Sequence, residues 1–306
     1  MNPVIEAAVP SRFNAIVVGS FSAIGIGLFG FLLLHYHLAV YGLVVFLAVP
    51  FVAGFVAKRL AGAGSNAFIA VMISIVIGLG VLVATGAEGW VCVLMAFPLL
   101  FLGIISGMAL ASWSSRRNYT SSNNAGLMVA IPLLIIGSGW LEKSVAPQYR
   151  LEVISTSIVL PETPEKLFDM LKGVDVVNAP RPFLMRIGLP VPTSCRLERG
   201  SVGAGRTCYF DHGYIKEEVV EWTPPTLMKM RVVENHVPGR HWLGFKDAIY
   251  TFTPNPDGTT TVIRTTSITT ALYPAIYWRP LERMGVETEH RYIFDDLSRR
   301  LQRKQP

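Results

Sequence analysis

Charged side chains are scarce in the first half of this 306-residue chain. The sequence holds 27 basic and 21 acidic residues, and only nine of them lie before residue 150. A surface that faces water usually carries about a quarter to a third charged residues, so this half cannot form an ordinary soluble domain. The second half carries as many charged residues as an ordinary soluble domain. We therefore predict a membrane domain over residues 1–145 and a soluble domain over residues 150–306.

Signatures of common catalytic and metal centres are also missing. The sequence has no nucleophile elbow, phosphate-binding glycine loop or dinucleotide fingerprint. His35 and His37 are two residues apart and do not share a helical face, and His212, His236 and His241 lack the spacing of a zinc site. We expect no metal and no cofactor. The net charge of +6 is spread along the chain, so nucleic acid is not an expected partner.

Long apolar runs fill the first half instead. Each is near the ~20 residues that a helix needs to cross ~30 Å of hydrocarbon. None carries a charged residue near its middle, which argues against a transporter because such residues mark ion pathways. Gly103 and Gly107 form a GxxxG pair, typical of close helix packing, so a homo-oligomer through the membrane helices stays open. The five predicted spans are residues 15–34, 38–57, 67–84, 91–112 and 125–141.

The positions of Lys and Arg in the short loops predict the orientation, since such loops face the cytoplasm. Arg12 precedes the first predicted span, and Lys58 with Arg59 and Arg116 with Arg117 follow the second and fourth. Five spans then place the N-terminus in the cytoplasm and the soluble domain outside, in the periplasm of a Gram-negative cell. The predicted location is the bacterial inner or plasma membrane.

The soluble half has an α+β pattern: one strand, one helix, five or six further strands and a long closing helix. Thr163 and Pro164 fit the N-cap and first position of the short helix. Val286, His290, Ile293, Leu297 and Leu301 form one stripe of the last helix by their spacing of three and four residues. A curved antiparallel sheet wrapped on that helix would leave a cavity for a ligand. The predicted strands are residues 151–160, 195–199, 206–210, 214–222, 227–233, 246–253 and 259–270, and the long helix is residues 280–303.

Several segments of this half are similar to a known superfamily. They are IVLPETPEKLFDML at residues 158–171, GAGRTCYF at 203–210, the strand of 213–225 that ends in two prolines, and YPAIYW at 273–278. Over residues 151–303 the chain resembles the START and polyketide-cyclase-like (SRPBCC) superfamily, the helix-grip fold shared with the birch-pollen-allergen proteins. The resemblance implies that fold and no shared catalytic residues. The membrane half resembles no family.

Glu217 is the first candidate for chemistry in the predicted cavity. Ile215, Glu217 and Val219 share one face of their strand by the period of two. A lone acid among apolar neighbours would have a raised pKa and could donate a hydrogen bond or act as a general acid or base. The alternative is that Glu217 pairs with an arginine at the rim of the sheet.

Other side chains of the predicted interior could also contact a ligand. His290 could face the cavity or be a satisfied core histidine. Arg264 and Arg279 could bind a carboxylate or phosphate group, or lie on the surface. The candidate ligand-binding residues are Glu217, Ile215, Val219, Met228, Met230, Trp222, His290 and Ile293, and further aromatic candidates are Tyr209, Tyr250, Trp242, Tyr277 and Trp278.

The chain has three cysteines. Cys195 and Cys208 flank the glycine-rich hairpin and could face each other across two strands. A disulfide is expected if the domain lies outside the cytoplasm, and it would contribute about 3 kcal/mol by loop entropy. Two reduced, buried thiols are the alternative.

Three functions fit these features. The preferred hypothesis is a membrane-anchored module that binds a hydrophobic small molecule or lipid in the cavity, with the lipid bilayer as its other partner. The second is an enzyme of the cyclase or hydratase type acting on a hydrophobic substrate. The third is a structural or sensory membrane protein without a ligand.

Overall fold

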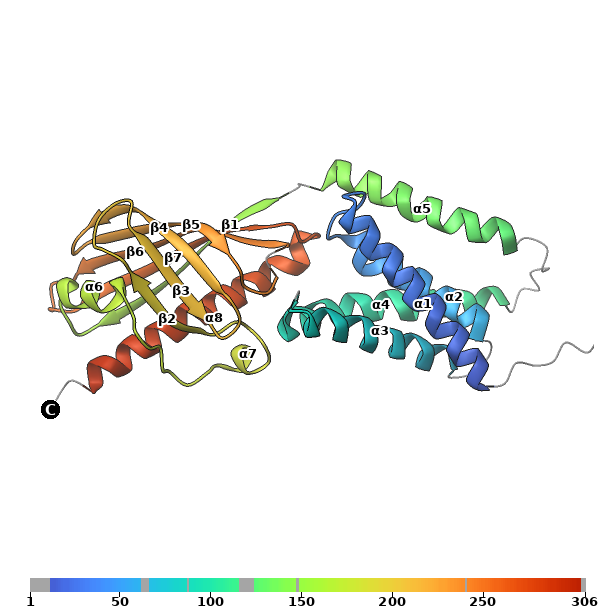
Figure 1. Cartoon of the computed structure of the whole chain (residues 1–306), viewed down its shortest axis with the longest axis horizontal. Coiled ribbons are helices and arrows are strands. Elements are labelled where there is room, and N and C mark those ends of the chain that lie inside the picture. The colour runs from blue at the N-terminus through green and yellow to red at the C-terminus, as the bar shows by residue number, and fades with distance from the viewer. Residues whose placement is uncertain are drawn as a thin grey trace, which may run out of the picture. The chain divides into compact units, whose positions relative to one another are not determined.

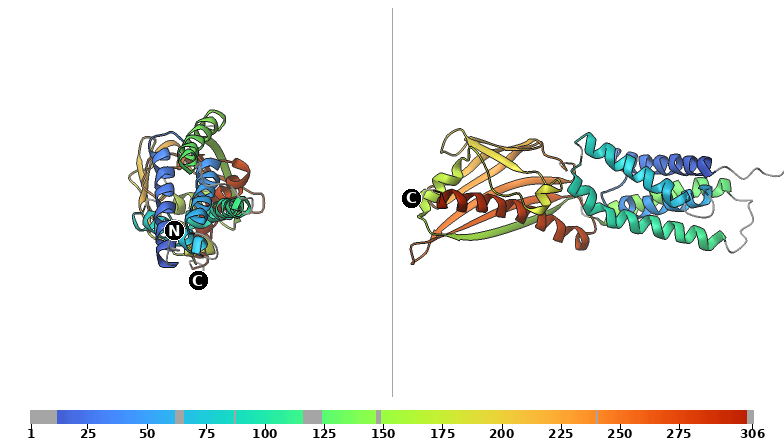
Figure 2. Two further views of the ribbon diagram at one scale, coloured as in Figure 1. Left: turned by 90° about the vertical axis from the view of Figure 1, so that its right-hand side faces the viewer. Right: turned by 90° about the horizontal axis from the view of Figure 1, so that it is seen from below.

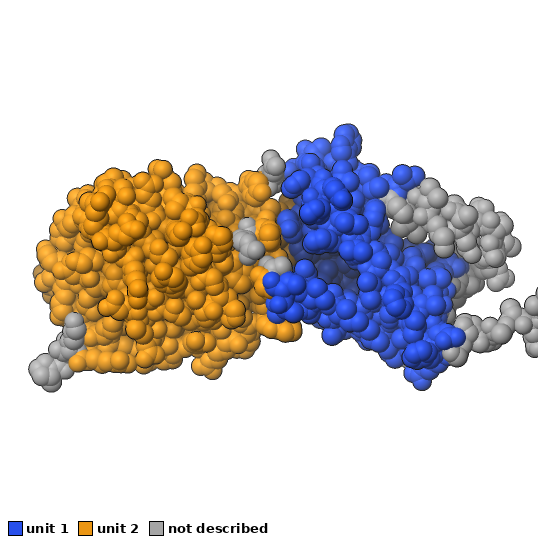
Figure 3. Space-filling view, in the orientation of Figure 1, with its two compact units in different colours: residues 1–85, 93–148 blue, residues 86–92, 149–306 orange. Residues whose placement is uncertain are grey.

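The computed structural model describes residues 12–61, 66–86, 88–115, 124–146, 149–239 and 241–303, and for residues 115 and 124–132 it describes the backbone alone. The chain divides into two compact units (Figure 3). Unit 1 comprises residues 1–85 and 93–148, and unit 2 comprises residues 86–92 and 149–306.

Helices make up the N-terminal half (Figure 1). A π-helical turn directly precedes α2, whose second residue is Pro50. Pro50 has no backbone N–H to donate to the carbonyl oxygen four residues earlier, as an α-helix requires. The π-helical turn therefore lies where the proline interrupts the α-helical hydrogen bonds. The elements are α1 (Arg12–His35), η1 (Val44–Ala48), α2 (Val49–Ala61), α3 (Asn66–Ala84), α4 (Trp90–Ser115) and α5 (Asn124–Val145).

Four of these helices are long and apolar enough to cross a membrane, within the residues that the structure describes. They are α1, η1 with α2, α3 and α4, and they indicate an integral membrane protein. The prediction of five spans is therefore wrong in number. The fifth apolar run is only 17 residues long before Glu142 and Lys143, shorter than the ~20 that a spanning helix needs. Part of that run lies outside the described side chains. The prediction that the soluble domain lies outside the cytoplasm was derived from a count of five spans, and four spans do not support it.

The end of α5 lies beside the loop between α1 and η1. Lys143 donates from Nζ to the carbonyl oxygen of His37 at 2.7 Å. The carboxylate of Glu142 accepts the backbone N–H groups of Leu43 and Val44 at 2.5 and 3.1 Å, as an acid does at a helix N-terminus. The chain therefore leaves unit 1 at the end that holds the α1–η1 loop.

Glycines bring α4 against α2. A Cβ atom on Gly107 would lie 1.9 Å from the carbonyl oxygen of Phe51, and one on Gly103 would lie 2.6 Å from that of Leu47. On α2, a Cβ atom on Gly54 would lie 2.5 Å from the carbonyl oxygen of Ile104. The GxxxG pair is thus used for packing within one chain.

The C-terminal half is a seven-stranded antiparallel sheet curled around one long helix (Figure 2). The strand order is β1-β7-β6-β5-β4-β3-β2, which confirms the predicted architecture. The bounds are β1 (Arg150–Leu160), α6 (Pro164–Lys172), α7 (Phe183–Arg186), β2 (Pro192–Leu197), β3 (Gly205–Phe210), β4 (Tyr214–Thr223), β5 (Leu227–Asn235), β6 (Leu243–Pro254), β7 (Thr260–Thr270) and α8 (Ala275–Gln302).

Helix α8 begins five residues before the predicted start at residue 280. Pro274 occupies the N-cap position in an extended conformation, and Pro280 lies inside the helix. All five residues of the predicted stripe, Val286, His290, Ile293, Leu297 and Leu301, are buried. At α6, Thr163 is the N-cap residue but its side chain makes no capping hydrogen bond.

Candidate functional site

The buried face of the sheet carries an ion pair between β3 and β4. Arg206 and Glu217 are direct partners in the register of these strands. Arg206 Nη1 donates to Glu217 Oε2 at 2.7 Å, and the two side chains are only 6% and 8% exposed. The arginine predicted as an alternative partner for Glu217 is therefore present, but it lies in the interior and not at the rim of the sheet.

A second ion pair joins β7 to α8. Arg264 Nη2 lies 2.8 Å from Glu289 Oε2, and both side chains are largely buried. The guanidinium of Arg264 also lies over the ring of Tyr250, its partner on β6, with 5.3 Å to the ring centre. Arg264 is thus held from two sides, by a carboxylate and by an aromatic face.

The two pairs form one electrostatic group with Tyr250. Burial raises the pKa of Tyr250, and the charges of Arg264 and Arg206 oppose that rise. Burial likewise raises the pKa of Glu289, against the pull of Arg264. Burial alone would lower the pKa of Arg264, but the neighbouring Glu289 and Tyr250 raise it overall. We name Arg206, Glu217, Tyr250, Arg264 and Glu289 the interior charge cluster.

The interior charge cluster contains donors without acceptors. Within the described part of the chain, Arg206 Nε and the Nε and Nη1 atoms of Arg264 are buried and have no hydrogen-bond partner. A buried N–H group left unpaired costs about 1–3 kcal/mol, and more when it is charged. Because a guanidinium only donates, a group that satisfied these atoms would have to present acceptor atoms.

His290 lies beside this cluster on α8. Its Nε2 is 2.7 Å from the hydroxyl of Thr266 and its Nδ1 is 3.0 Å from that of Thr156. Burial lowers the pKa of His290 to about 2, with a further contribution from the charge of Arg264. The imidazole is therefore neutral and has a partner at both nitrogens, which matches the alternative of a satisfied core histidine.

The apolar candidates line the inner face of the same sheet. Trp222 packs edge-on against Phe168 of α6, with 5.0 Å between ring centres. Among the aromatic candidates, Tyr250 is buried and Tyr209 is 43% exposed. Trp278 is buried as well, and the buried apolar candidates are Ile215, Val219, Met228 and Met230 on the sheet and Ile293 on α8.

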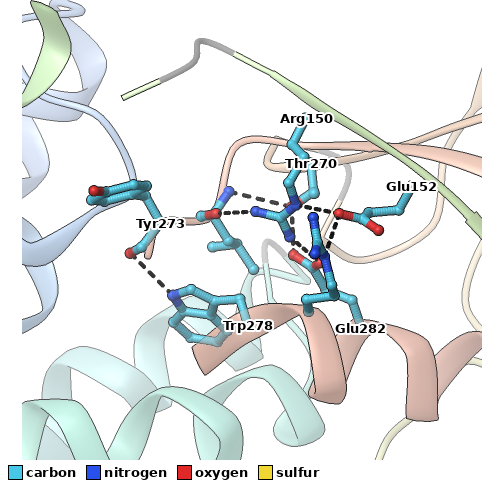
Figure 4. A network of polar contacts seen from close by, with 8 residues as sticks. Arg150, Glu152, Thr270, Tyr273, Trp278 and Glu282 are labelled. Carbon is cyan, nitrogen blue, oxygen red and sulfur yellow. Dashed lines mark hydrogen bonds and ion pairs between the residues drawn. The ribbon is translucent and has the colours of Figure 1, made fainter. Parts of the chain in front are cut away.

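A separate polar network joins the start of β1 to β7 and α8 (Figure 4). Arg150 pairs with Glu152 at 2.7 Å, donates to the carbonyl oxygen of Leu272 at 2.9 Å and pairs with Glu282. Thr270 donates to Glu282 at 2.7 Å. Arg279, a predicted head-group ligand, pairs with Glu152 at 2.8 Å and is 56% exposed. Arg150 has acceptors for its donors, so this network holds the fold together and does not resemble the interior charge cluster.

The two soluble-domain cysteines are direct partners across β2 and β3. Their sulfur atoms are joined at 2.06 Å, and both residues are buried. Cys92 is a free cysteine. Across the described ranges, no group of three or more His, Cys, Asp or Glu side chains is placed to hold a metal ion.

Sequence reasoning did not find Arg206 and Glu289 as members of the site. The turn between the strands of residues 206–210 and 214–222 offered a signal for Arg206, since pairing Tyr209 with Tyr214 places Arg206 opposite Glu217. Glu289 stands next to His290 in the sequence, at the edge of the apolar stripe of α8.

Comparisons with protein families and with curated proteins gave no match. Solved structures do match, over about half of this chain. A START superfamily protein from Mycobacterium smegmatis is 8% identical, with a TM-score of 0.38 over 49% of this chain and 97% of its own.

Two further structures are similar in the same way. Truncated norcoclaurine synthase from Thalictrum flavum is 12% identical, with a TM-score of 0.34 over 51% of this chain and 96% of its own. The Aha1 dimer from Colwellia psychrerythraea is 13% identical, with a TM-score of 0.31 over 48% and 96%. These three structures are similar to the C-terminal half of this chain, and the four apolar helices match no family.

Proposed function

We propose that this protein binds a hydrophobic small molecule or lipid between the curled sheet and α8 of a domain tethered to the membrane. The observation that carries the proposal is the interior charge cluster, which sits in an otherwise apolar interior. Phe168, Met228 and Phe252 belong to the apolar core of the same domain. An interior with many apolar groups and a few convergent polar groups is typical of small-molecule sites.

The membrane helices support a ligand that partitions into lipid. Many large apolar side chains of unit 1 are exposed, among them Phe21, Val76 and Leu102, as expected for helices that face hydrocarbon chains. A domain tethered beside the bilayer could take up such a molecule after a short path through water.

We further propose that the soluble domain lies on the side opposite the N-terminus, because α5, which is not among the four spans, returns the chain to the end of unit 1 that holds the α1–η1 loop. Arg12 begins α1, Lys58 and Arg59 end α2, and Arg116 with Arg117 follow α4. These basic residues favour the cytoplasm for their ends of the helices. The α1–η1 loop is at the other end, where α5 finishes against it.

The test is ligand extraction from the purified full-length protein. A protease site placed between residues 146 and 149 would release the soluble domain from its lipid-bound anchor. Organic extraction of that domain followed by mass spectrometry should yield a defined hydrophobic molecule in about equal molar amount. An empty domain would instead favour a structural or sensory role without a ligand.

A second candidate function is catalysis of the cyclase or hydratase type. It is favoured by one specific observation, which is that two buried carboxylate–guanidinium pairs lie inside the domain and that both arginines influence the pKa of the buried phenol of Tyr250. Glu217→Gln and His290→Ala should then abolish turnover of a bound molecule and leave its binding intact. Unchanged turnover in both variants would exclude this function.

A further inference from the structure

Residues 86–92 belong to the same compact unit as the soluble domain, although in the sequence they join the two membrane spans α3 and α4. Trp242, which directly precedes β6, donates from Nε1 to the carboxylate of Glu88, at 3.0 Å from each oxygen. Gly188 follows α7, and a Cβ atom on it would lie 2.9 Å from the Cβ atom of Trp90. Because so short a connection cannot reach far from the ends of two spans, the parts of unit 2 that contact it lie near the membrane surface.

The same end of the sheet holds the starts of β1 and α8 (Figure 1). Ala271 donates its backbone N–H to the carbonyl oxygen of Trp242 at 2.9 Å, and α8 begins shortly afterwards. Arg150, the first residue of β1, donates to the carbonyl oxygen of Leu272 at 2.9 Å. The β2–β3, β4–β5 and β6–β7 turns lie at the opposite end, as the registers of these antiparallel strands require.

Large apolar side chains are exposed at the end that holds the start of α8. Ile276 of α8 is 88% exposed and Phe183 of α7 is 70% exposed, and Leu151 of β1 is exposed as well. The opposite end exposes smaller apolar side chains, such as Val159 and Val202. Isoleucine and phenylalanine gain free energy when a partner removes them from water, so the end with α7 and the start of α8 is the one suited to an apolar partner.

The first turns of α8 expose apolar and basic side chains together. Their spacing of three and four residues places them on one face of the helix. Such a face is typical of helices that lie in the surface of a bilayer, where the apolar groups enter the head-group layer and arginines reach the phosphates. The exposed residues of these turns are Ile276, Arg279, Pro280, Arg283 and Met284. Further along α8 the exposed residues are charged, at Arg291, Asp295 and Arg299.

We infer that this end of the soluble domain docks on the surface of the phospholipid bilayer, with Ile276 and Phe183 inserted into the head-group layer. The partner is the bilayer because residues 86–92, which join two membrane spans, contact the same end of the domain. Arg279 and Arg283 then lie at the level of the lipid phosphates. The docking goes beyond the proposed function, since it needs no ligand inside the domain.

Fluorescent labelling of the full-length protein in lipid nanodiscs tests the docking. Ile276→Cys, Phe183→Cys and Val202→Cys are made singly in a Cys92→Ser background, and each new cysteine carries an NBD fluorophore. Val202 is the matched control, because it is 61% exposed in the β2–β3 turn at the opposite end. Labels at positions 276 and 183 should be shielded from aqueous iodide and quenched by phospholipids that carry a nitroxide near the head group. The label at position 202 should show the reverse.

A charge placed in the docking surface gives a second measurement. Ile276→Asp should reduce the nitroxide quenching of the label at position 183, because a carboxylate is disfavoured in the apolar part of the interface, whereas Val202→Asp should leave it unchanged. Labels at 276 and 183 as accessible to iodide as the control would overturn the docking. Shielding without nitroxide quenching would show that protein covers this end and would overturn it as well. Both outcomes leave the proposed ligand site standing, since ligand extraction tests that site separately.

Discussion

Arg206 on β3 and Glu217 on β4 face each other in direct register and form a 2.7 Å ion pair in the interior of the domain. Breaking such a pair leaves one charge buried without a partner, which costs about 3–5 kcal/mol. Glu217→Leu should therefore lower the free energy of unfolding by that amount in urea denaturation of the detergent-solubilised protein.

The double variant Arg206→Leu with Glu217→Leu should recover most of this loss, because two apolar groups can replace a buried pair at little net cost. The matched control is Glu234→Leu, which breaks the half-exposed pair of Glu234 with Lys216 and should lower the free energy of unfolding far less, because water screens an exposed pair. A Glu217→Leu protein as stable as the control would show that the pair is open to solvent.

His290 predicts a specific dependence of stability on pH. Its pKa is about 2 in the folded protein, against an ordinary value of 6.5. Between these values the unfolded chain binds a proton that the folded chain excludes. The contribution of His290 to the free energy of unfolding should therefore be fully present above pH ~6.5. It should decrease on acidification below that pH, by up to ~1.4 kcal/mol per pH unit.

The variant His290→Gln should lose that part of the slope, as measured by urea denaturation between pH 7 and pH 4. His212→Gln changes an exposed histidine and should keep the slope of the parent protein. Identical slopes in all three proteins would contradict the assignment of a neutral, buried His290.

Gly107 predicts a packing constraint in the membrane half. Because a Cβ atom there would lie 1.9 Å from the carbonyl oxygen of Phe51, Gly107→Leu should force α4 away from α2 and destabilise unit 1 by about 1–3 kcal/mol, as overpacking does. Gly78→Leu is the control, since no atom lies within 4 Å of a Cβ at that position. Thermal unfolding in detergent should separate the two variants, and equal midpoints would show that the α2–α4 contact is dispensable.

The cysteine pair predicts the side of the membrane on which the domain lies. In a Cys92→Ser background, a maleimide reagent should not label Cys195 or Cys208, either in intact cells or after the protein is denatured. Labelling should appear only after a reductant is added, because the two thiols are joined in a disulfide. Cys195→Ser should lower the free energy of unfolding by about 3 kcal/mol, given the sequence separation of 13 between the two cysteines. Two thiols that react without reductant would contradict the proposed placement outside the cytoplasm.

The sequence predicted the sheet and the closing helix because their signals are local. Alternating strands, the turn at residues 254–258 and the stripe from Val286 to Leu301 each depend on neighbours within a few residues. The number of spans was wrong because hydropathy alone extended the fifth run to the edge of Glu142. The start of α8 was wrong because Pro280 fits a first helical position as well as the interior turn that it occupies.

The interior charge cluster could be predicted only in part for a related reason. Glu217 was found because the period of two places it on the same face of its strand as Ile215 and Val219. Arg264 lies on a strand rich in threonine, where alternation does not decide which face points inward. The pairing of Arg264 with Glu289 depends on how α8 lies across the sheet, which no local pattern in the sequence encodes.

The most direct test of a ligand between the sheet and α8 is an experimental density map of the protein purified from its own membrane. We expect elongated density among the apolar core residues, beside the interior charge cluster that holds Arg206 and Arg264. An interior filled by protein side chains alone, with the two arginines bonded only to Glu217 and Glu289, would contradict the proposed binding function.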